Sequence, residues 1–557
     1  MRLLVLSTLS GAVVLLLLSL FRFVIKFRSY RAFYKDVPCP PHDPIWGHLK
    51  LLGDLLAELP PNFHYQSLME YIGRKYNMPP VYQLDLWPAA HPMILCSDPA
   101  AIAHMTQTHS FPKHPAIDSF VSPLTGKPTM VAVDGPEYKK IRSIVMPSFA
   151  PSHVASLTPV MSRHVARFIE KLEAFADTGE TFKLQDHAMS LTLDVICEVV
   201  MGIDTDSQRQ YNALAYHFGQ AAKNTPISGL NLGVLKMFIP RWWHASRQTS
   251  IVTKIIRDRH AQSAGTKSQR TKVAIDLFIQ AYNEQQSGAT DQTRLDPSFS
   301  NLAVVNIKTL LMGGHDTTSA TIAYMLALLS THPAVTAKLR AEHERVFSGD
   351  PTTTFATIAA QIDAKPALLS DSSLPYTAAC IKETLRVFTP GNSNRLNPAD
   401  PSEGITYNGN EHIRTLPGAQ LWLLLPRLHR DPAVFPRPHS FIPERHLPSS
   451  PFGPIPKDAF RPFEKGPRAC VGSEIAMMEM KLVLIGLVCS GLIGDVRYPD
   501  PTPLAPEGSG LGGVDSGVDA EGNVYEERRW WSVMEFAAKP NQGLPFGVLR
   551  PQSATKK

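Results

Sequence analysis

The chain has 557 residues, 44% hydrophobic and 19% charged, a composition typical of a large globular protein. Its formal net charge of +6 is a small excess for this length, and no long lysine or arginine run occurs, so we do not expect nucleic acid as a partner. The six cysteines are widely spaced without a CxxC pair, which argues against a zinc site, a c-type haem attachment or a disulfide scaffold.

The N-terminus is predicted to be a membrane anchor. Residues 3–21, LLVLSTLSGAVVLLLLSLF, form an uncharged apolar run of about the length of a bilayer-crossing helix. The basic residues that follow favour a cytosolic body behind a single span at residues 1–22. A cleaved signal peptide is the alternative, but its apolar region would be shorter. Residues 23–49 are predicted to be a basic, proline-rich hinge, because prolines cannot continue a helix.

The body, residues 50–550, is predicted to be one mainly α-helical domain with a minor β-sheet region. Apolar spacings of three and four residues dominate it, and strand-like runs are short and few. Its longest helical pattern, residues 298–333, is apolar on nearly every side, which indicates a central buried helix. A second membrane span is the alternative there, but Lys308, His315 and Asp316 at its centre argue against it.

The centre of this helix contains GGHDTTS, residues 313–319. Each glycine inside a helix costs about 1 kcal/mol of stability relative to alanine, so two together indicate that the missing side chains serve a purpose there. Their missing side chains leave space beside the helix, and Thr317 or Thr318 can bond a backbone carbonyl and distort the turn. With Asp316 buried nearby, this pattern favours a small-ligand pocket with a proton route. Close helix packing around a paired structural carboxylate is the alternative.

A second motif pairs Glu383 with Arg386, three residues apart on one predicted helix face. By itself this spacing indicates only a surface ion pair, which contributes little. Arg445, in the proline-framed segment FIPERHL, is a candidate third partner in a buried network.

Cys470 lies in the glycine-containing loop PFEKGPRACVG, which runs into a predicted helix. A helix start and nearby Arg468 both lower a thiol's pKa, so this cysteine is placed to be a thiolate. Gly466 and Gly472 permit a tight loop whose N–H groups could point at sulfur. Without CxxC spacing or an adjacent histidine base, such a thiolate suits metal ligation better than protease chemistry. An inert core cysteine is the alternative.

Near the C-terminus, residues 505–523 are predicted to be a flexible insertion and residues 551–557 a tail. The insertion contains a literal GxGxxG spacing at residues 508–513. A dinucleotide-binding turn would follow a strand and open a helix, whereas this stretch follows a proline-rich loop.

The segment FEKGPRACVG, residues 463–472, resembles the FxxGxRxCxG haem-thiolate signature of the cytochrome P450 superfamily. GGHDTT resembles that family's oxygen-activation motif, and Glu383, Arg386 and Arg445 resemble its ExxR helix and PER loop. Motif order and spacing agree from about residue 40 to 550, and the predicted anchor resembles those of endoplasmic-reticulum members.

The resemblance implies the family fold, a helix-rich prism around haem b with a long central helix. It implies that Cys470 is the axial thiolate ligand of the iron, and that Asp316 and Thr317 deliver protons for O2 activation. Tyr138 stands in place of the tryptophan of a WxxxR segment, and His446 stands where an aromatic residue is usual, a change in packing. The further haem contacts implied by position are Phe463, Gly466, Gly472, Arg468, Arg142, Tyr138 and Arg395.

These features predict a monooxygenase that inserts one oxygen atom of O2 into a lipophilic substrate, which would enter from the membrane lipid. We expect pocket residues at 111–127, 231–243, 310–317 and 390–394, and near Phe546. Electrons would come from NADPH through a separate cytochrome P450 reductase, with cytochrome b5 as a further candidate donor. An isomerase that does not use O2, and a non-catalytic haem carrier, are the alternatives. The sequence as a whole resembles fungal P450 enzymes of polyketide or terpenoid metabolism. The alternative is a hydroxylase of xenobiotics, sterols or fatty acids.

Overall fold

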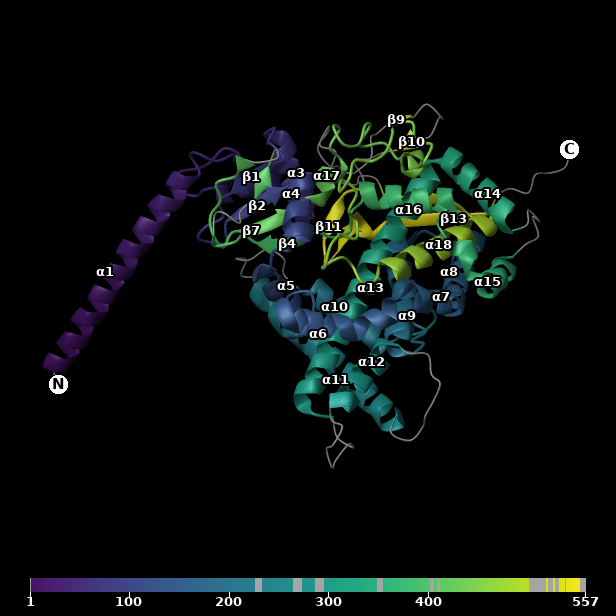
Figure 1. Ribbon diagram of the computed structural model, residues 1–557, viewed down its shortest axis with the longest axis horizontal. Coiled ribbons are helices and arrows are strands. Elements are labelled where there is room, and N and C mark those ends of the chain that lie inside the picture. The colour runs from purple at the N-terminus through teal and green to yellow at the C-terminus, as the bar shows by residue number, and fades with distance from the viewer. Residues whose placement is uncertain are drawn as a thin grey trace.

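A 35-residue helix, α13 (Pro297–Thr331), crosses the centre of the body in this computed structural model (Figure 1). The Asp296 side chain accepts hydrogen bonds from the Ser298 and Phe299 N–H groups and caps the first turn. Most residues of α13 are buried, so the predicted central helix is confirmed. The structure describes residues 2–225, 233–263, 273–285, 295–347, 354–400, 405–407, 411–499, 517–518, 524–525, 530–535 and 537–550.

Other helices surround α13. The most extensive packing against it comes from α9 (Leu184–Met201), and α11 (Gly233–Ser263), α16 (Pro375–Val387) and α18 (Ser473–Cys489) also contact it. The remaining described α-helices are α1 (Arg2–Phe33), α2 (Leu49–Glu58), α3 (Tyr65–Lys75), α4 (Pro99–Ala103), α5 (Ala116–Thr125), α6 (Gly135–Val145), α7 (Pro151–Ser156), α8 (Thr158–Thr178), α10 (Ala213–Lys223), α12 (Ala274–Gln285), α14 (Pro333–Phe347), α15 (Phe355–Ala364) and α17 (Leu425–His429). Short helical turns are η1 (His104–Thr108), η2 (Met146–Phe149), η3 (Pro366–Leu369), η5 (Pro443–His446) and η7 (Asn541–Gly543).

The β-structure is small and divided. Its largest sheet has the order β1 (Val81–Leu84), β2 (Met93–Cys96), β7 (Gln420–Leu423), β4 (Ser393–Leu396), and lies at the end of the body that α1 leaves (Figure 1). β2 and β7 are parallel and the outer pairs antiparallel. The other strands pair as β3 (Phe182–Lys183) and β8 (Ile493–Val496) with β13 (Pro545–Leu549), β5 (Thr406–Tyr407) with β6 (Glu411–His412), β9 (Gly517–Val518) with β10 (Val524–Tyr525), and β11 (Ser532–Met534) with β12 (Ala538–Pro540). The predicted class, mainly α with minor β-sheets, is confirmed.

Helix α1 projects from the body (Figure 1). Large apolar side chains along residues 13–25 are exposed, and Phe23, Phe27 and Tyr30 contact the Trp87 ring of the body. The helix continues to its end at Phe33, so the basic part of the predicted hinge is helical.

Within the described ranges, no single helix combines the length and apolar character needed to cross a membrane. Helices α13 and α14 meet that test only as a pair, and they are bent by 106° at their junction. The N-terminal anchor therefore stays a prediction. The predicted tail and most of the predicted insertion, including its GxGxxG spacing, lie outside the described residues.

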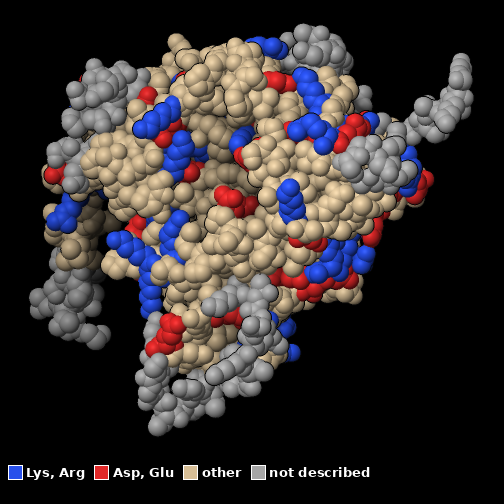
Figure 2. Space-filling view, turned by 45° about the vertical axis from the view of Figure 1, so that its right-hand side comes forward, with Lys and Arg blue, Asp and Glu red and all other residues tan. Residues whose placement is uncertain are grey.

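The surface carries both charge signs. On the face shown in Figure 2, Lys and Arg are interspersed with Asp and Glu, and the surface is hollowed near its middle. Ion pairs that join distant parts of the chain include Arg167 with Asp204 and Arg550 with Asp177.

Candidate active site

A cavity of about 370 Å³ lies between the centre of α13 and the loop that precedes α18. Gly313, Gly314 and Thr317 line it from α13, and Cys470 lines it from the loop. Most of its wall is apolar. Three of the predicted pocket stretches contribute: residues 111–127 through Lys113, residues 310–317 through Leu310, Gly313, Gly314 and Thr317, and residues 390–394 through Pro390 to Ser393. Phe546 and the described part of residues 231–243 do not line the cavity.

The two adjacent glycines of α13 serve different purposes. A Cβ on Gly313 would meet no atom within 4 Å, so this residue leaves open space. A Cβ on Gly314 would lie 2.5 Å from Ile196 Cγ1, so this residue permits the close approach of α9. The Thr317 hydroxyl donates to the Gly313 carbonyl at 2.9 Å, as predicted. The cavity at Gly313 and the close packing at Gly314 are therefore both present, while the proton route stays a prediction.

The loop that carries Cys470 is closed by its own backbone. The Cys470 N–H donates to the Phe463 carbonyl at 2.9 Å, and the Ala469 N–H donates to the Gly466 carbonyl at 3.0 Å. Gly466 has a φ of +88°, and a Cβ there would lie 2.4 Å from the Thr106 carbonyl oxygen. Glycine is therefore required at this turn for both conformation and space.

The Cys470 thiol faces the cavity, and protein surrounds it on its other sides; the surface that it exposes is cavity wall. Burial raises the pKa of this thiol, while the Gly472 and Ser473 backbone and the Arg142 charge act to lower it. The predicted net lowering is therefore wrong for the protein chain alone. The cation that acts on the sulfur is Arg142, not Arg468, but the predicted effect of the helix start is present.

Arg468 lies beside the cavity in a set of fixed contacts. Its guanidinium donates to the Asp134 carboxylate and to the Val133 carbonyl, each at 2.5 Å. It also lies 3.6 Å from the centroid of the Tyr138 ring. The side chain is buried, so ion pair and stacking together fix its direction.

Tyr138, which stands where the family pattern has tryptophan, bonds to the cysteine loop itself. Its hydroxyl donates to the Pro467 carbonyl and accepts from Arg142 Nη1, both at 2.9 Å. Arg142 also donates to the Ala469 carbonyl at 3.2 Å. Tyr138 and Arg142 both line the cavity.

Two further cations lie near this end of the cavity: Lys113 lines it, whereas Arg395 does not but is bonded to Ser393, which does. Neither side chain hydrogen-bonds to an acid. Arg395 Nη1 donates to Ser393 Oγ at 2.7 Å and to the Asn394 carbonyl at 2.9 Å, whereas its buried Nε and Nη2 have no hydrogen-bond partner. Lys113 Nζ donates to the same Ser393 hydroxyl at 2.9 Å. Burial lowers the pKa of Arg395 to about 10 and lowers the pKa of Lys113, which Arg395 lowers further. Such buried cations require an anion.

The predicted acid–threonine pair faces two ways. Thr317 lines the cavity, but Asp316 does not. The Asp316 carboxylate is bound by Lys539, with Oδ1 at 2.5 Å from Nζ. Its second oxygen, Oδ2, accepts from the Ala537 N–H at 2.7 Å, so the carboxylate is bonded to residues outside the cavity wall.

The ExxR motif forms the expected network. Arg386 binds both oxygens of Glu383 at 2.8 Å, Arg445 Nε lies 3.3 Å from Oε1, and His446 Nε2 lies 3.0 Å from Oε2. Burial by itself would raise the pKa of Glu383, but Arg386 and His446 lower it well below its usual range. His446, expected to change only packing, is thus a fourth member of the network.

Comparison with known proteins decides the family. The model described as Cytochrome P450 matches residues 37–489. The chain belongs to the cytochrome P450 family. It is 32% identical to Cytochrome P450 monooxygenase acrF of Aspergillus aculeatus over 88% of this chain and 98% of that protein. It is 30% identical to Cytochrome P450 monooxygenase polC of Polytolypa hystricis, over 82% of each.

More distant P450s are similar in sequence or in fold. Human Cytochrome P450 4V2 is 26% identical over 86% of this chain and 88% of its own. The crystal structure of the cytochrome P450DA heme domain has a TM-score of 0.68 at 22% identity, covering 93% of this chain and 98% of that one. The predicted resemblance is confirmed, and with it the enzyme class: cytochromes P450 are haem-dependent monooxygenases that use O2.

The residues of this P450 fit a haem group. A cysteine in the cavity wall supplies the sulfur that the family places on iron. The unpaired nitrogens of Arg395, with Lys113 beside them, suit the carboxylates of haem propionates. The open space at Gly313 lets a flat ring system approach α13.

Two contributors were missed by sequence reasoning, and two were included without their role. Lys113 belongs to a stretch expected to line the pocket but carries no motif, and Lys539 is brought to Asp316 only by the C-terminal strands. His446 was named but given no bond. Glu479, which lines the cavity, is buried with an unpartnered Oε1, and burial raises its pKa to about 8. Its signal was available, because an acid in so apolar a helix as α18 is unusual.

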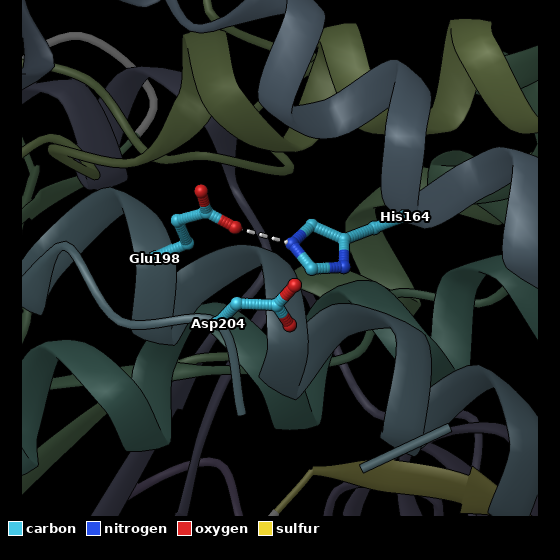
Figure 3. Close-up of side chains that lie close together, drawn as sticks. All are labelled: His164, Glu198 and Asp204. Atoms are coloured by element: carbon cyan, nitrogen blue, oxygen red, sulfur yellow. Dashed lines mark hydrogen bonds and ion pairs between the residues drawn. The ribbon is translucent and has the colours of Figure 1, made fainter. Parts of the chain in front are cut away.

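A separate cluster away from the cavity has the residue types of a metal site. His164 of α8 and Glu198 of α9 approach Asp204, and His164 Nε2 lies 2.7 Å from a Glu198 oxygen (Figure 3). Arg163 already binds Glu198, and Arg167 binds both oxygens of Asp204. The arginines thus neutralise the carboxylates, and the cluster is a set of ion pairs that links α8 to α9 and to the residues after it.

Proposed function

We propose that this cytochrome P450 oxidises a lipophilic specialised metabolite of polyketide or terpenoid type, with Cys470 as the iron ligand and Thr317 handling protons. The observation that carries the proposal is that Cys470 and Thr317 line one mostly apolar cavity. Bound haem would supply the redox chemistry that activates O2. The chain's own residues bind the haem edges, orient the sulfur and exclude bulk water.

The ligand assignment rests on the closed loop around Cys470. Cys470→Ala should abolish the red-shifted absorption band that marks a thiolate-ligated, reduced carbon monoxide complex. Cys197→Ala is the matched control, since Cys197 is a buried cysteine of α9 that does not line the cavity. An unchanged band in the Cys470 variant would remove this residue as ligand.

Thr317 is proposed to pass protons toward the cavity, because its hydroxyl is at the wall beside the open space of Gly313. Thr317→Ala should raise the share of NADPH electrons recovered as hydrogen peroxide. Thr331→Ala is the control, because Thr331 of the same helix also bonds the carbonyl four residues back, at 3.3 Å, but lies outside the cavity wall. Equal peroxide yields in wild type and Thr317→Ala would reject the role.

We also propose an N-terminal anchor in the endoplasmic-reticulum membrane and an NADPH–cytochrome P450 reductase as electron donor. The exposed apolar side chains of α1 support the anchor. Phe238, Ile239 and Trp242 of α11 are also exposed and lie beside Arg241, a combination suited to a membrane interface and to a lipophilic substrate. The full chain expressed in yeast should stay in the membrane pellet after alkaline carbonate washing; release into the supernatant would reject the anchor.

The substrate class is tested by binding. Purified protein titrated with polyketide and terpenoid test compounds should show the spectral change of water displacement from haem iron with one of these classes. A response only to a fatty acid or a sterol would favour the alternative hydroxylase function. Product formation without O2 or NADPH would favour an isomerase.

A further inference from the structure

The C-terminal hairpin of β11 and β12 reaches the acid of the central helix. Lys539 of β12 places Nζ at 2.5 Å from Asp316 Oδ1, and the Ala537 N–H donates to Asp316 Oδ2 at 2.7 Å. The side chains of Lys539 and Asp316 are each only 2% exposed. Both carboxylate oxygens are therefore occupied by the hairpin.

The hairpin is itself fixed beside the cavity. The Ala538 N–H donates to the carbonyl of Pro390, which lines the cavity, and Tyr324 of α13 hydrogen-bonds Ser532 at 2.9 Å. Asp316 is thus attached to a rigid partner and cannot turn toward the cavity without leaving Lys539.

Lys539 has a second acid. Glu535, four residues earlier, places Oε2 at 2.8 Å from Nζ, and its side chain is 31% exposed. The third neighbour of Nζ is the Met189 sulfur of α9, at 3.5 Å. Removing the sole partner of a buried cation is strongly unfavourable, but a second carboxylate already in place avoids leaving the charge unpaired.

We propose that Lys539 and Glu535 are positioning residues for proton delivery: Lys539 holds Asp316 away from the cavity, and Glu535 keeps Lys539 paired while Asp316 is released. This inference rests on the proposed role of Asp316 and Thr317. In the released state the Asp316 carboxylate accepts a proton from a hydronium ion of the solvent, forming an O–H bond and leaving water. It then passes that proton toward Thr317, which restores the carboxylate. Lys539 stays protonated throughout and is not a proton source.

The electrostatics around Asp316 agree with this arrangement. Burial acts to raise the pKa of Asp316, but Lys539 and the neighbouring His315 lower it below its usual value. His315 Nδ1 lies 2.9 Å from the Leu311 carbonyl. The acid is accordingly held as a carboxylate for as long as Lys539 binds it.

The test compares variants with opposite expected effects, using the full-length holoprotein, a reductase and NADPH, without substrate. Glu535→Gln leaves Lys539 with Asp316 alone, and should lower the released population about two- to fivefold, the factor expected from one partly exposed ion pair. The peroxide share of NADPH electrons and the solvent deuterium isotope effect should both rise. Lys539→Met should lower both below the wild-type values, because nothing then holds Asp316 away from the cavity. Lys539→Arg, which can keep both ion pairs, should match wild type.

A matched control and a measurement without turnover distinguish a role of Lys539 in proton delivery from a role in stability alone. Lys481→Met removes another buried lysine that is paired with an acid, Asp371, outside the cavity. It should lower Tm as Lys539→Met does, without any change in peroxide share. In thermal unfolding, Lys539→Met combined with Asp316→Asn should lower Tm by less than the sum of the single variants, because the two side chains form one pair.

Three results would overturn the inference. Additive Tm losses would show that Lys539 and Asp316 do not interact. Unchanged peroxide share and isotope effect in Glu535→Gln, with Thr317→Ala still uncoupled, would reject the positioning roles alone. An unchanged Thr317→Ala variant would reject the proposed proton route, and the positioning roles with it.

Discussion

Glu479 should make the stability of this P450 fall as pH rises. The residue is 2% exposed, its Oε1 has no partner, and burial raises its pKa from 4.5 to about 8. The folded state therefore holds a proton that the unfolded state releases above its ordinary pKa, so the favourable contribution is complete below pH 4.5 and is lost progressively up to about pH 8. The loss of unfolding free energy relative to low pH is at most about 5 kcal/mol, and it is about 3 kcal/mol at pH 7.

The assay is the Tm of the holoprotein measured across this pH range in wild type and Glu479→Gln. The amide keeps the shape of the protonated acid but does not titrate, so the Tm of the variant should exceed that of wild type increasingly above pH 4.5, with a plateau near pH 8. Glu474→Gln, at an exposed position in the first turn of the same helix, is the control and should follow wild type. Parallel pH profiles of wild type and Glu479→Gln would refute a protonated buried acid.

Two substitutions test the loop and the ExxR network. Gly466→Ala should lower haem content and Tm, because a Cβ there would lie 2.4 Å from a backbone oxygen at a φ of +88°. Gly219→Ala in α10 is the control, because a Cβ there would meet no atom within 4 Å and Gly219 does not line the cavity; equal effects of the two substitutions would contradict this. Glu383→Gln should destabilise by about 3–5 kcal/mol, because it leaves Arg386 and Arg445 buried without a counter-charge. The control is Glu58→Gln, which removes the acid of an exposed ion pair with Lys75. Equal Tm values of the Glu383→Gln and Glu58→Gln variants in thermal unfolding would refute the stabilising role of the network.

Local patterns predicted what local physics determines. The central helix was located because its apolar residues continue on every side. The Gly313–Gly314 pair indicated the cavity because two glycines at a helix centre lower helix stability and therefore suggest that space is needed there. Glu383 and Arg386 are three residues apart on one helix, so their pairing follows from helix geometry.

Contacts set by tertiary structure escaped prediction. Lys539 reaches Asp316 only because the β11–β12 hairpin packs against α13. The pairing register of the two strands decides that Lys539, rather than a neighbouring residue, points toward Asp316. The direction of the Cys470 pKa was also wrong, since burial depends on how the loop packs rather than on the residues beside the cysteine.

Arg395 gives a final prediction in which the sign of the effect depends on haem. Two of its guanidinium nitrogens are buried without partners, and burial lowers its pKa to about 10, so the side chain is a cost to the chain without haem. Arg395→Met should therefore raise the Tm of protein refolded without haem and lower the Tm of the haem-loaded protein, where a propionate would pair with the arginine. Arg163→Met, which removes a partly exposed arginine from its ion pair with Glu198, should shift both forms alike. A lower Tm in both forms of Arg395→Met would mean that Arg395 serves packing alone, because only an arginine that binds an anionic group of haem changes the sign of its contribution when that group is added.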